Sequence, residues 1–177
     1  LGFFIEHKKR MAERLGAEHI ELNQVPRSQL DAHQAALVAV FQYMIGNTDW
    51  SILKGEGEEE CCHNAKLIET ADRRTLGIPY DFDFAGMVSA EYAFVTSGIP
   101  IGDVRQRYYR GFCMHNDGLD EVFDLIRSRR DEISLLITEE RSLSNDKRQR
   151  ILRYLRGFYN IIEDPRKLER RLKATCR

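Results

Sequence analysis

The chain has 177 residues, of which 42% are hydrophobic and 31% charged, an ordinary composition for one folded domain with a sizeable core. It carries 27 Lys and Arg against 28 Asp and Glu, so a net charge of −1 gives no global attraction to nucleic acid or to an anionic membrane. Its longest apolar runs are too short to cross a bilayer. We therefore expect a soluble protein without a nucleic-acid partner or a transmembrane segment.

The chain opens on an apolar run, residues 1–5, that predicts a buried strand and is not preceded by Met. We expect such a start to lie inside a larger protein. A short helix is predicted from Lys8 to Leu15, because the apolar residues Met11 and Leu15 lie one helical turn apart and Gly16 is a favoured residue just after a helix.

A longer helix is predicted after Ser28 and Asp31, whose spacing resembles a capping box. Its buried face is formed by apolar residues at helical spacing: Leu30, Leu37, Val38, Phe41 and Met44. The helix is expected to end near Gly46, and Asn47-Thr48-Asp49 is then a turn. The acidic stretch Gly55 to Glu60 is typical of a solvated loop.

Two short apolar stretches, Ala65 to Ile68 and Ile78 to Phe84, are separated by the polar stretch Glu69 to Gly77. This pattern predicts a β-hairpin with a charged connection. The hairpin is one small sheet element in a chain that is otherwise mostly helical. We therefore expect an α+β fold that is mostly helical.

Four further helices are predicted in the second half of the chain. Asp103 is expected to cap the first of these helices, which runs through Val104, Tyr108 and Phe112. The next begins at Asn116 or Asp117, the third at Ser144 or Asn145, and the last has Asp164 as its cap and Pro165 at its first position.

The four cysteines are Cys61, Cys62, Cys113 and Cys176. Adjacent cysteines do not readily pair and the other two are scattered, so we expect reduced thiols, which favours a cytoplasmic location. Cys61-Cys62-His63 lacks the two-residue spacer of a zinc corner, and no second Cys/His pair follows at a finger-like distance.

The polar residues with the clearest chemical meaning are Asp49, Asn64 and the triplet Asp81-Phe82-Asp83, because each borders an apolar stretch. A carboxylate in such a place is costly unless it binds a cation, accepts several hydrogen bonds or takes part in a reaction. Carboxylate and amide oxygens are the hard ligands that Mg²⁺ prefers. The sequence therefore predicts a shared metal and phosphate site.

The motifs GNTDW, HNAKLI and IPYDFDFAG, in this order, resemble the catalytic half of the protein-kinase-like fold, and most closely its atypical bacterial branch of CotH-type spore-coat kinases. The resemblance implies that Asp49 is the catalytic base and that Asn64 and Asp81 bind Mg²⁺. Asp83 matches a second acid of that branch and is a further candidate metal ligand. The implied cofactors are Mg²⁺ and ATP.

The same resemblance makes residues 1–7 a hinge-like strand, with Phe4, Glu6 and His7 beside the nucleotide. It makes 8–112 the catalytic core and 113–177 a set of C-terminal helices within one C-lobe domain, with the N-lobe outside this chain. Asp49 and Asn64 are fifteen positions apart, against about five in ordinary protein kinases. The implied function is phosphoryl transfer to an acceptor that the sequence does not identify.

Other interpretations remain open at this stage. The domain is alternatively a non-catalytic pseudokinase or a helical interaction domain, with its own N-lobe as partner. Asp49 alone is also explained by a helix-terminating turn, and Arg105, Arg107 or Arg110 would make Asp81 and Asp83 a structural ion network. A metallophosphoesterase is less favoured, because GNTD lacks the upstream Asp-x-His and Gly-Asp metal motifs.

Overall fold

The computed structural model describes residues 5–55 and 60–177. This part of the chain is α+β and mostly helical, with six α-helices and one three-stranded antiparallel sheet. In chain order the elements are α1 (Lys8–Arg14), β1 (Ala17–Ile20), α2 (Ala32–Ile45), β2 (Ala65–Thr70), β3 (Thr75–Pro79), α3 (Leu119–Ser128), α4 (Arg130–Glu139), α5 (Asn145–Ile162) and α6 (Pro165–Arg171). Short 3-10 helices span Arg27–Gln29, Cys113–Gly118 and Lys173–Thr175.

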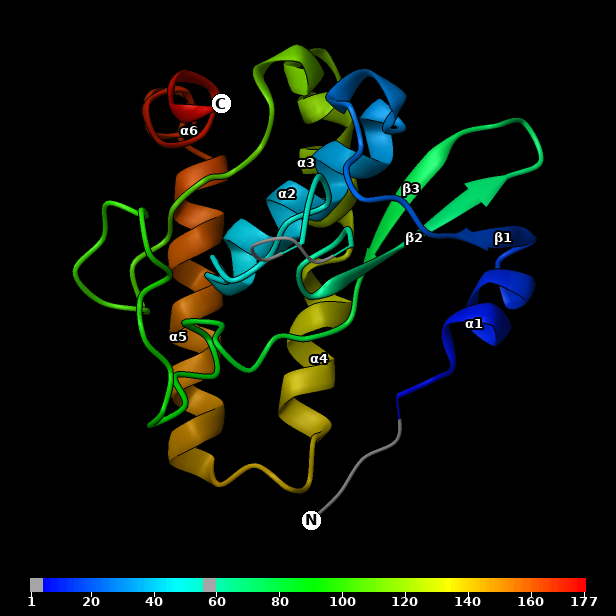
Figure 1. Ribbon diagram of the computed structural model, residues 1–177. Coiled ribbons are helices and arrows are strands. Elements are labelled where there is room, and N and C mark those ends of the chain that lie inside the picture. The colour runs from blue at the N-terminus through cyan, green and yellow to red at the C-terminus, as the bar shows by residue number, and fades with distance from the viewer. Residues whose placement is uncertain (1–4, 56–59) are drawn as a thin grey trace.

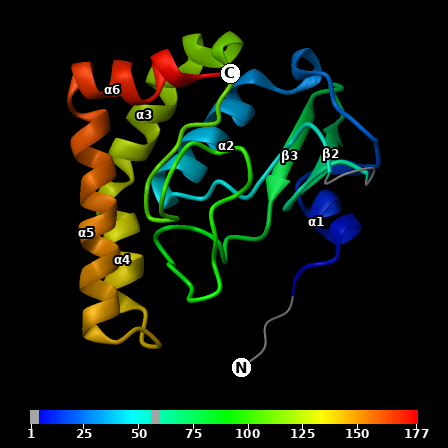
Figure 2. The same ribbon diagram turned by 60° about the vertical axis from the view of Figure 1, so that its left-hand side comes forward.

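Helix α2 lies at the centre, between the sheet on one side and the C-terminal helices on the other (Figure 1). Its composition explains this place, because apolar residues and the buried Gln42 surround it on most sides instead of forming one narrow stripe. Turning the molecule shows α4 and α5 side by side and α6 crossing the end of α5 (Figure 2). The main core gathers around α2 and includes Trp50, Phe123 and Phe158, each at most 1% exposed.

The sheet has the order β1-β2-β3, and β2 is its central strand. Ala65 pairs with Pro79 and Glu69 with Thr75, so β2 and β3 form the predicted hairpin. The hairpin prediction is thus confirmed, but its second strand ends at Pro79 instead of Phe84. Proline has no N–H for a further ladder bond, and the acidic triplet follows the strand as turn structure. Strand β1 was not predicted; it pairs with β2 from Ala17 to Ile20.

Local capping signals predicted the helix ends well. Asp31 accepts a hydrogen bond from the Gln34 N–H at 2.7 Å and begins α2, which ends at Gly46 with φ +70°. Ser144 caps α5, and Asp164 caps α6 with Pro165 in its first turn. The helix predicted over 104–112 is wrong: residues 80–112 contain neither helix nor strand.

The prediction of reduced cysteines is also wrong. Cys113 and Cys176 form a disulfide with Cα atoms 5.0 Å apart, and Cys61 and Cys62 form a second one between neighbours. The first joins the segment before α3 to the end of the chain after α6, a pairing between residues 63 positions apart that no local pattern reveals. Disulfides persist in oxidising compartments, so the thiol argument for a cytoplasmic location no longer applies.

At the N-terminal end, Ile5, Glu6 and His7 lie in neither helix nor strand, and the rest of the predicted hinge strand falls outside the described residues. His7 caps α1 by accepting a hydrogen bond from the Lys9 N–H at Nδ1. In the described part of the chain, no helix has the length and apolar character needed to cross a membrane.

Candidate functional site around Asp49

Asp49 is held by the loop that leaves α2. Gly46 turns the chain with a left-handed backbone, and Asn47 Oδ1 then accepts a hydrogen bond from the Asp49 N–H at 2.9 Å. This is the side-chain turn expected where an Asn lies between two apolar elements. Asn47 itself is 1% exposed, so its amide is a fixed part of the loop.

Asp49 is brought together with His63 and Asn64. Its Oδ1 is 2.9 Å from His63 Nε2, and its Oδ2 accepts from Asn64 Nδ2 at 2.9 Å. Asn64 Nδ2 also donates to the Asp49 backbone carbonyl at 2.8 Å. The acidic stretch between them therefore does not keep the two predicted residues apart. Both carboxylate oxygens are fixed, and 17% of the Asp49 side chain stays exposed.

The contact depends on the backbone just before β2. Ser51 and His63 form an isolated antiparallel bridge, in which the Ser51 N–H donates to the His63 carbonyl at 2.9 Å. Asn64 has φ +53°, a left-handed conformation that Asn tolerates better than most non-glycine residues. The bridge and the turn at Asn64 direct both side chains toward Asp49.

Asp81 and Asp83 lie together in the turn that follows β3. Asp81 Oδ1 accepts from the Asp83 N–H at 3.3 Å, and Phe82 packs edge-on against Phe41 of α2 with ring centres 5.7 Å apart. Burial first, and the neighbouring Asp81 charge second, raise the pKa of the Asp83 carboxyl above its usual value, while contact with the Tyr92 hydroxyl acts in the opposite direction. The Asp83 carboxyl is therefore easier to protonate than an exposed aspartate.

Backbone bonds join this turn to the loop of Asp49. Asn47 Nδ2 donates to the Asp81 carbonyl at 3.3 Å, and the Gly86 N–H donates to the Gly46 carbonyl at 3.0 Å. On the other side, the Tyr80 N–H donates to the Asn64 carbonyl at 3.1 Å. The predicted residues Asp49, Asn64 and Asp81 thus lie on three segments that are tied to one another.

Two cavities open beside these segments. The first, of about 390 Å³, is lined by Asp49, Trp50 and His63. The second, of about 420 Å³, is lined by Glu6, His7 and Tyr80, next to Asp81. Glu6 forms an ion pair with Arg14 at 2.7 Å. Phe4, the third predicted nucleotide residue, lies outside the described residues.

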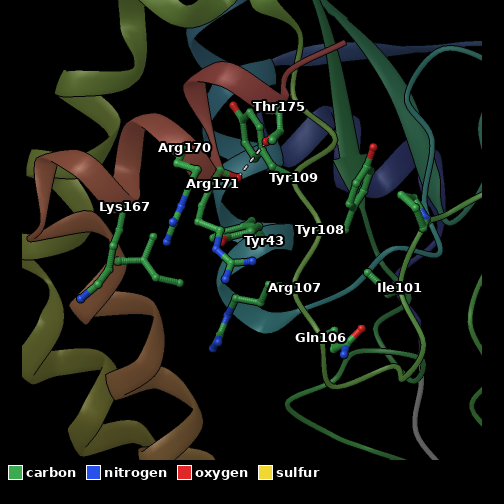
Figure 3. A pocket seen from close by; sticks show the side chains of 12 residues that line it. Tyr43, Ile101, Gln106, Arg107, Tyr108, Tyr109, Lys167, Arg170, Arg171 and Thr175 are labelled. Carbon is green, nitrogen blue, oxygen red and sulfur yellow. Dashed lines mark hydrogen bonds between the residues drawn. The ribbon is translucent and has the colours of Figure 1, made fainter.

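A cavity of about 830 Å³, larger than either of these two, lies elsewhere. Arg107, Tyr108 and Tyr109 line one part of it, and Lys167, Arg170 and Arg171 of α6 line another (Figure 3). None of the predicted site residues borders it. Size alone therefore does not select the site, whereas the meeting of Asp49, His63 and Asn64 does.

The predicted ligand set contains carboxylate and amide oxygens, which are donor types that Mg²⁺ accepts. In the described ranges, no group of three or more His, Cys, Asp or Glu is placed to hold a metal without other ligands. The predicted set of Asn64, Asp81 and Asp83 offers two carboxylates and one amide oxygen. Mg²⁺ commonly takes only one or two carboxylates and completes its shell with water and substrate phosphates.

The alternative of a structural ion network is not supported. Arg105 pairs with Asp103, Arg107 donates to the carbonyls of Met44 and Tyr154, and Arg110 donates to the carbonyls of Thr48 and Trp50. Across the described ranges, none of these three arginines pairs with Asp81 or Asp83. The arginines instead fix loops by binding backbone oxygens.

Sequence reasoning missed two contributors to the site. His63 was not among the predicted site residues, yet it contacts the Asp49 carboxylate. Asn47 was assigned only to a turn, yet it binds both Asp49 and Asp81. The signal available was the repetition of small polar residues, Asn47-Thr48-Asp49 and His63-Asn64, at the ends of apolar elements.

Comparisons of the chain with protein-family models, with curated proteins and with solved structures give no match.

Proposed function

We propose that this chain is the catalytic half of an ATP- and Mg²⁺-dependent phosphotransferase with a protein-kinase-like fold. The observation that carries the proposal is the double hydrogen bond from Asn64 Nδ2 to the carbonyl and carboxylate of Asp49. Because the amide nitrogen of Asn64 donates to Asp49, the amide oxygen of Asn64 points away from Asp49. One residue thus both positions a base and offers a metal ligand.

Asp49 has the surroundings that a base for an acceptor hydroxyl requires. His63 and Asn64 fix its two oxygens, and the carboxylate borders the 390 Å³ cavity. Phosphoryl transfer needs a carboxylate that orients the attacking hydroxyl and accepts its proton. A fixed rotamer lowers the entropy cost of that alignment.

The 420 Å³ cavity supports a place for the nucleotide. It lies between the segment before α1 and the β2–β3 hairpin, and Ile78, Pro79 and Tyr80 of its wall lead directly into Asp81. A base bound there would have its phosphates near the acidic turn. Asn64, Asp81 and Asp83 would then hold the magnesium ion, which neutralises phosphate charge when bound.

Asp49→Asn tests the proposal in the purified full-length protein. We expect the variant to bind ATP and Mg²⁺ normally but to lose transfer by at least about 100-fold, because it removes a general base. Asp81→Asn should instead weaken the Mg²⁺-dependent part of ATP binding. Asp124→Asn is the matched control, since this carboxylate on α3 is 77% exposed. Calorimetry measures binding, and γ-phosphate transfer measures activity.

Unchanged transfer in both Asp49→Asn and Asp81→Asn contradicts the proposal. Mg²⁺-dependent ATP binding without transfer by the wild type favours the pseudokinase alternative. Binding of neither ATP nor Mg²⁺ favours the interaction domain. Hydrolysis of a phosphate ester without ATP favours the phosphoesterase.

A further inference from the structure

The cavity in front of Asp49 has an unusual charge balance. Among the described residues, its lining includes four cationic side chains, Arg27, Lys54, Arg110 and Arg177, and one carboxylate, that of Asp49. The chain as a whole has a net charge of −1, so this excess is local. Within the described residues, Arg27, Lys54 and Arg177 have no carboxylate partner.

The cations are close enough to repel one another. Burial first, and the Arg177 charge second, lower the pKa of the Arg110 guanidinium to about 10. Burial first, and the Arg27 charge second, lower the pKa of Arg177. The guanidinium carbons of Arg27 and Arg177 are 5.1 and 5.4 Å from the centre of the same Phe112 ring. A cluster of like charges of this kind is relieved by an anion.

Two residues of the cavity lining also carry buried N–H groups. Trp50 is 1% exposed, and its indole Nε1 has no hydrogen-bond partner among the described residues. Arg110 Nε is likewise buried there without a partner, although its Nη1 donates to the carbonyls of Thr48 and Trp50. Buried donors are nearly always satisfied, by protein, water or ligand.

We infer that this cavity binds the phosphate group of a small phosphorylated acceptor, whose free hydroxyl is thereby presented to Asp49. The inference rests on the proposed function for the role of Asp49. The volume of about 390 Å³ is in the range of small-molecule sites. Phosphate offers several acceptor oxygens and close to two negative charges, which match guanidinium forks better than a single carboxylate does.

The experiment is a titration of the purified protein with inorganic phosphate, at constant ionic strength made up with chloride. Trp50 is the chain's single tryptophan, so its fluorescence reports the cavity directly. We expect a saturable change with phosphate and none with chloride or acetate. An equal response to chloride or acetate, or no saturation with phosphate, overturns the inference.

Arg27→Gln should weaken phosphate binding about tenfold, the usual effect of losing one hydrogen bond to a charged group. Arg27 is exposed and relieving its repulsion of Arg177 does not endanger the fold, and Lys54→Gln is a second exposed variant with the same expected direction. Arg156→Gln on α5 is the matched control, because it is exposed and outside the cavity. Wild-type affinity in both Arg27→Gln and Lys54→Gln overturns the assignment.

Asp49→Asn separates this inference from the proposed function. The variant removes the one negative charge that faces the phosphate, so we expect unchanged or tighter phosphate binding together with lost transfer. Transfer that depends on Asp49 without any phosphate titration overturns only the inference. Phosphate binding that depends on Arg27, in a protein that transfers nothing, overturns only the proposed function.

Discussion

The side-chain nitrogen of Asn47 donates a hydrogen bond to the backbone carbonyl of Asp81 at 3.3 Å, although the two residues are 34 positions apart. The amide oxygen of Asn47 meanwhile accepts from the Asp49 N–H. One buried side chain thus joins the segment of the candidate base to the segment of the candidate metal ligands. Its removal should affect both folding and activity.

Asn47→Ala is expected to lower the free energy of unfolding by about 1–3 kcal/mol, because it leaves an N–H and a carbonyl without their partner. Denaturant unfolding measures this loss. Asn160→Ala is the control, since Asn160 is exposed on α5. An equal effect of the two substitutions would show that the Asn47 bridge contributes nothing.

The Asp81–Asp83 pair predicts a pH-dependent gain in stability for Asp81→Asn. Asp83 has a raised pKa in the folded state, so its protonated form contributes stability that is fully present below its usual value of 3.8 and is lost as pH rises through the folded pKa. The Asn side chain in Asp81→Asn keeps an oxygen that accepts from the Asp83 N–H, and it removes the charge repulsion between the two carboxylates. The variant should be more stable at pH 7 by up to about 1 kcal/mol, with no difference in acid.

Asp103→Asn provides a control of opposite sign. Hydrogen bonds from Arg105 hold the pKa of Asp103 well below its usual value, so its stabilising contribution is present at neutral pH and is lost in acid. Thermal unfolding across pH 3–7 distinguishes the two variants. A loss of stability in Asp81→Asn at pH 7 would show that the acidic pair is not in electrostatic conflict.

Gly46→Ala tests the close approach of Tyr154 to the C-terminal end of α2. A Cβ at this position would lie 1.9 Å from the Tyr154 hydroxyl, and the backbone has φ +70°. We expect Gly46→Ala to lower the free energy of unfolding by about 1–2 kcal/mol because of the left-handed backbone, and by about 1–3 kcal/mol more because of the overlap with Tyr154. Gly16→Ala is matched, because Gly16 has φ +66° with nothing within 4 Å of the added carbon.

The difference between these two glycine variants in denaturant unfolding isolates the overlap with Tyr154. Adding Tyr154→Phe to Gly46→Ala should recover part of the loss, since it deletes the oxygen that the new carbon meets. Equal costs at the two glycines would contradict the close packing of α2 against α5.

The two disulfides should differ in their contribution to stability. Cys113–Cys176 closes a loop of 63 positions, and replacing both cysteines by Ala should cost about 2–4 kcal/mol, mostly by freeing the unfolded chain. Replacement of Cys61 and Cys62 is the control, because neighbours close no loop. Guanidinium unfolding of both double variants measures the difference. A smaller loss for the 113–176 pair would refute the loop argument.

The helices were the predictable part of this fold, because their signals are local. Ser144 and Asp164 each cap the helix that the sequence assigned to them, whereas α2 is capped by Asp31, the second residue of the expected capping box, and not by Ser28. Strand β1 was missed since its four residues are defined by pairing with β2 and not by their own pattern. Helix α4 was missed because its apolar residues do not form a clear stripe and none of them is buried.

The failed helix over 104–112 has a tertiary cause. Arg107 and Arg110 donate to carbonyls of Met44, Thr48 and Trp50, around 60 positions away, and these bonds hold the segment in an irregular path. Tyr109 of this segment packs edge-on against Tyr43 of α2. For the candidate site, Asp49 and Asn64 were chosen from their order along the chain, and the structure brings them into contact. The contact with His63 and the cationic cavity required the folded chain.

The left-handed backbone at Asn64 has a consequence for variation at this position. Gly, Asn and Asp all visit φ near +53° with little penalty. Of these, Gly has no side chain and ionised Asp has no donor, so Asn alone can bind Asp49 as observed. A library randomised at position 64 should therefore return Gly, Asn and Asp when sorted for folding, and Asn only when sorted for phosphoryl transfer. The left-handed backbone and the hydrogen bonds to Asp49 together restrict position 64 to Asn.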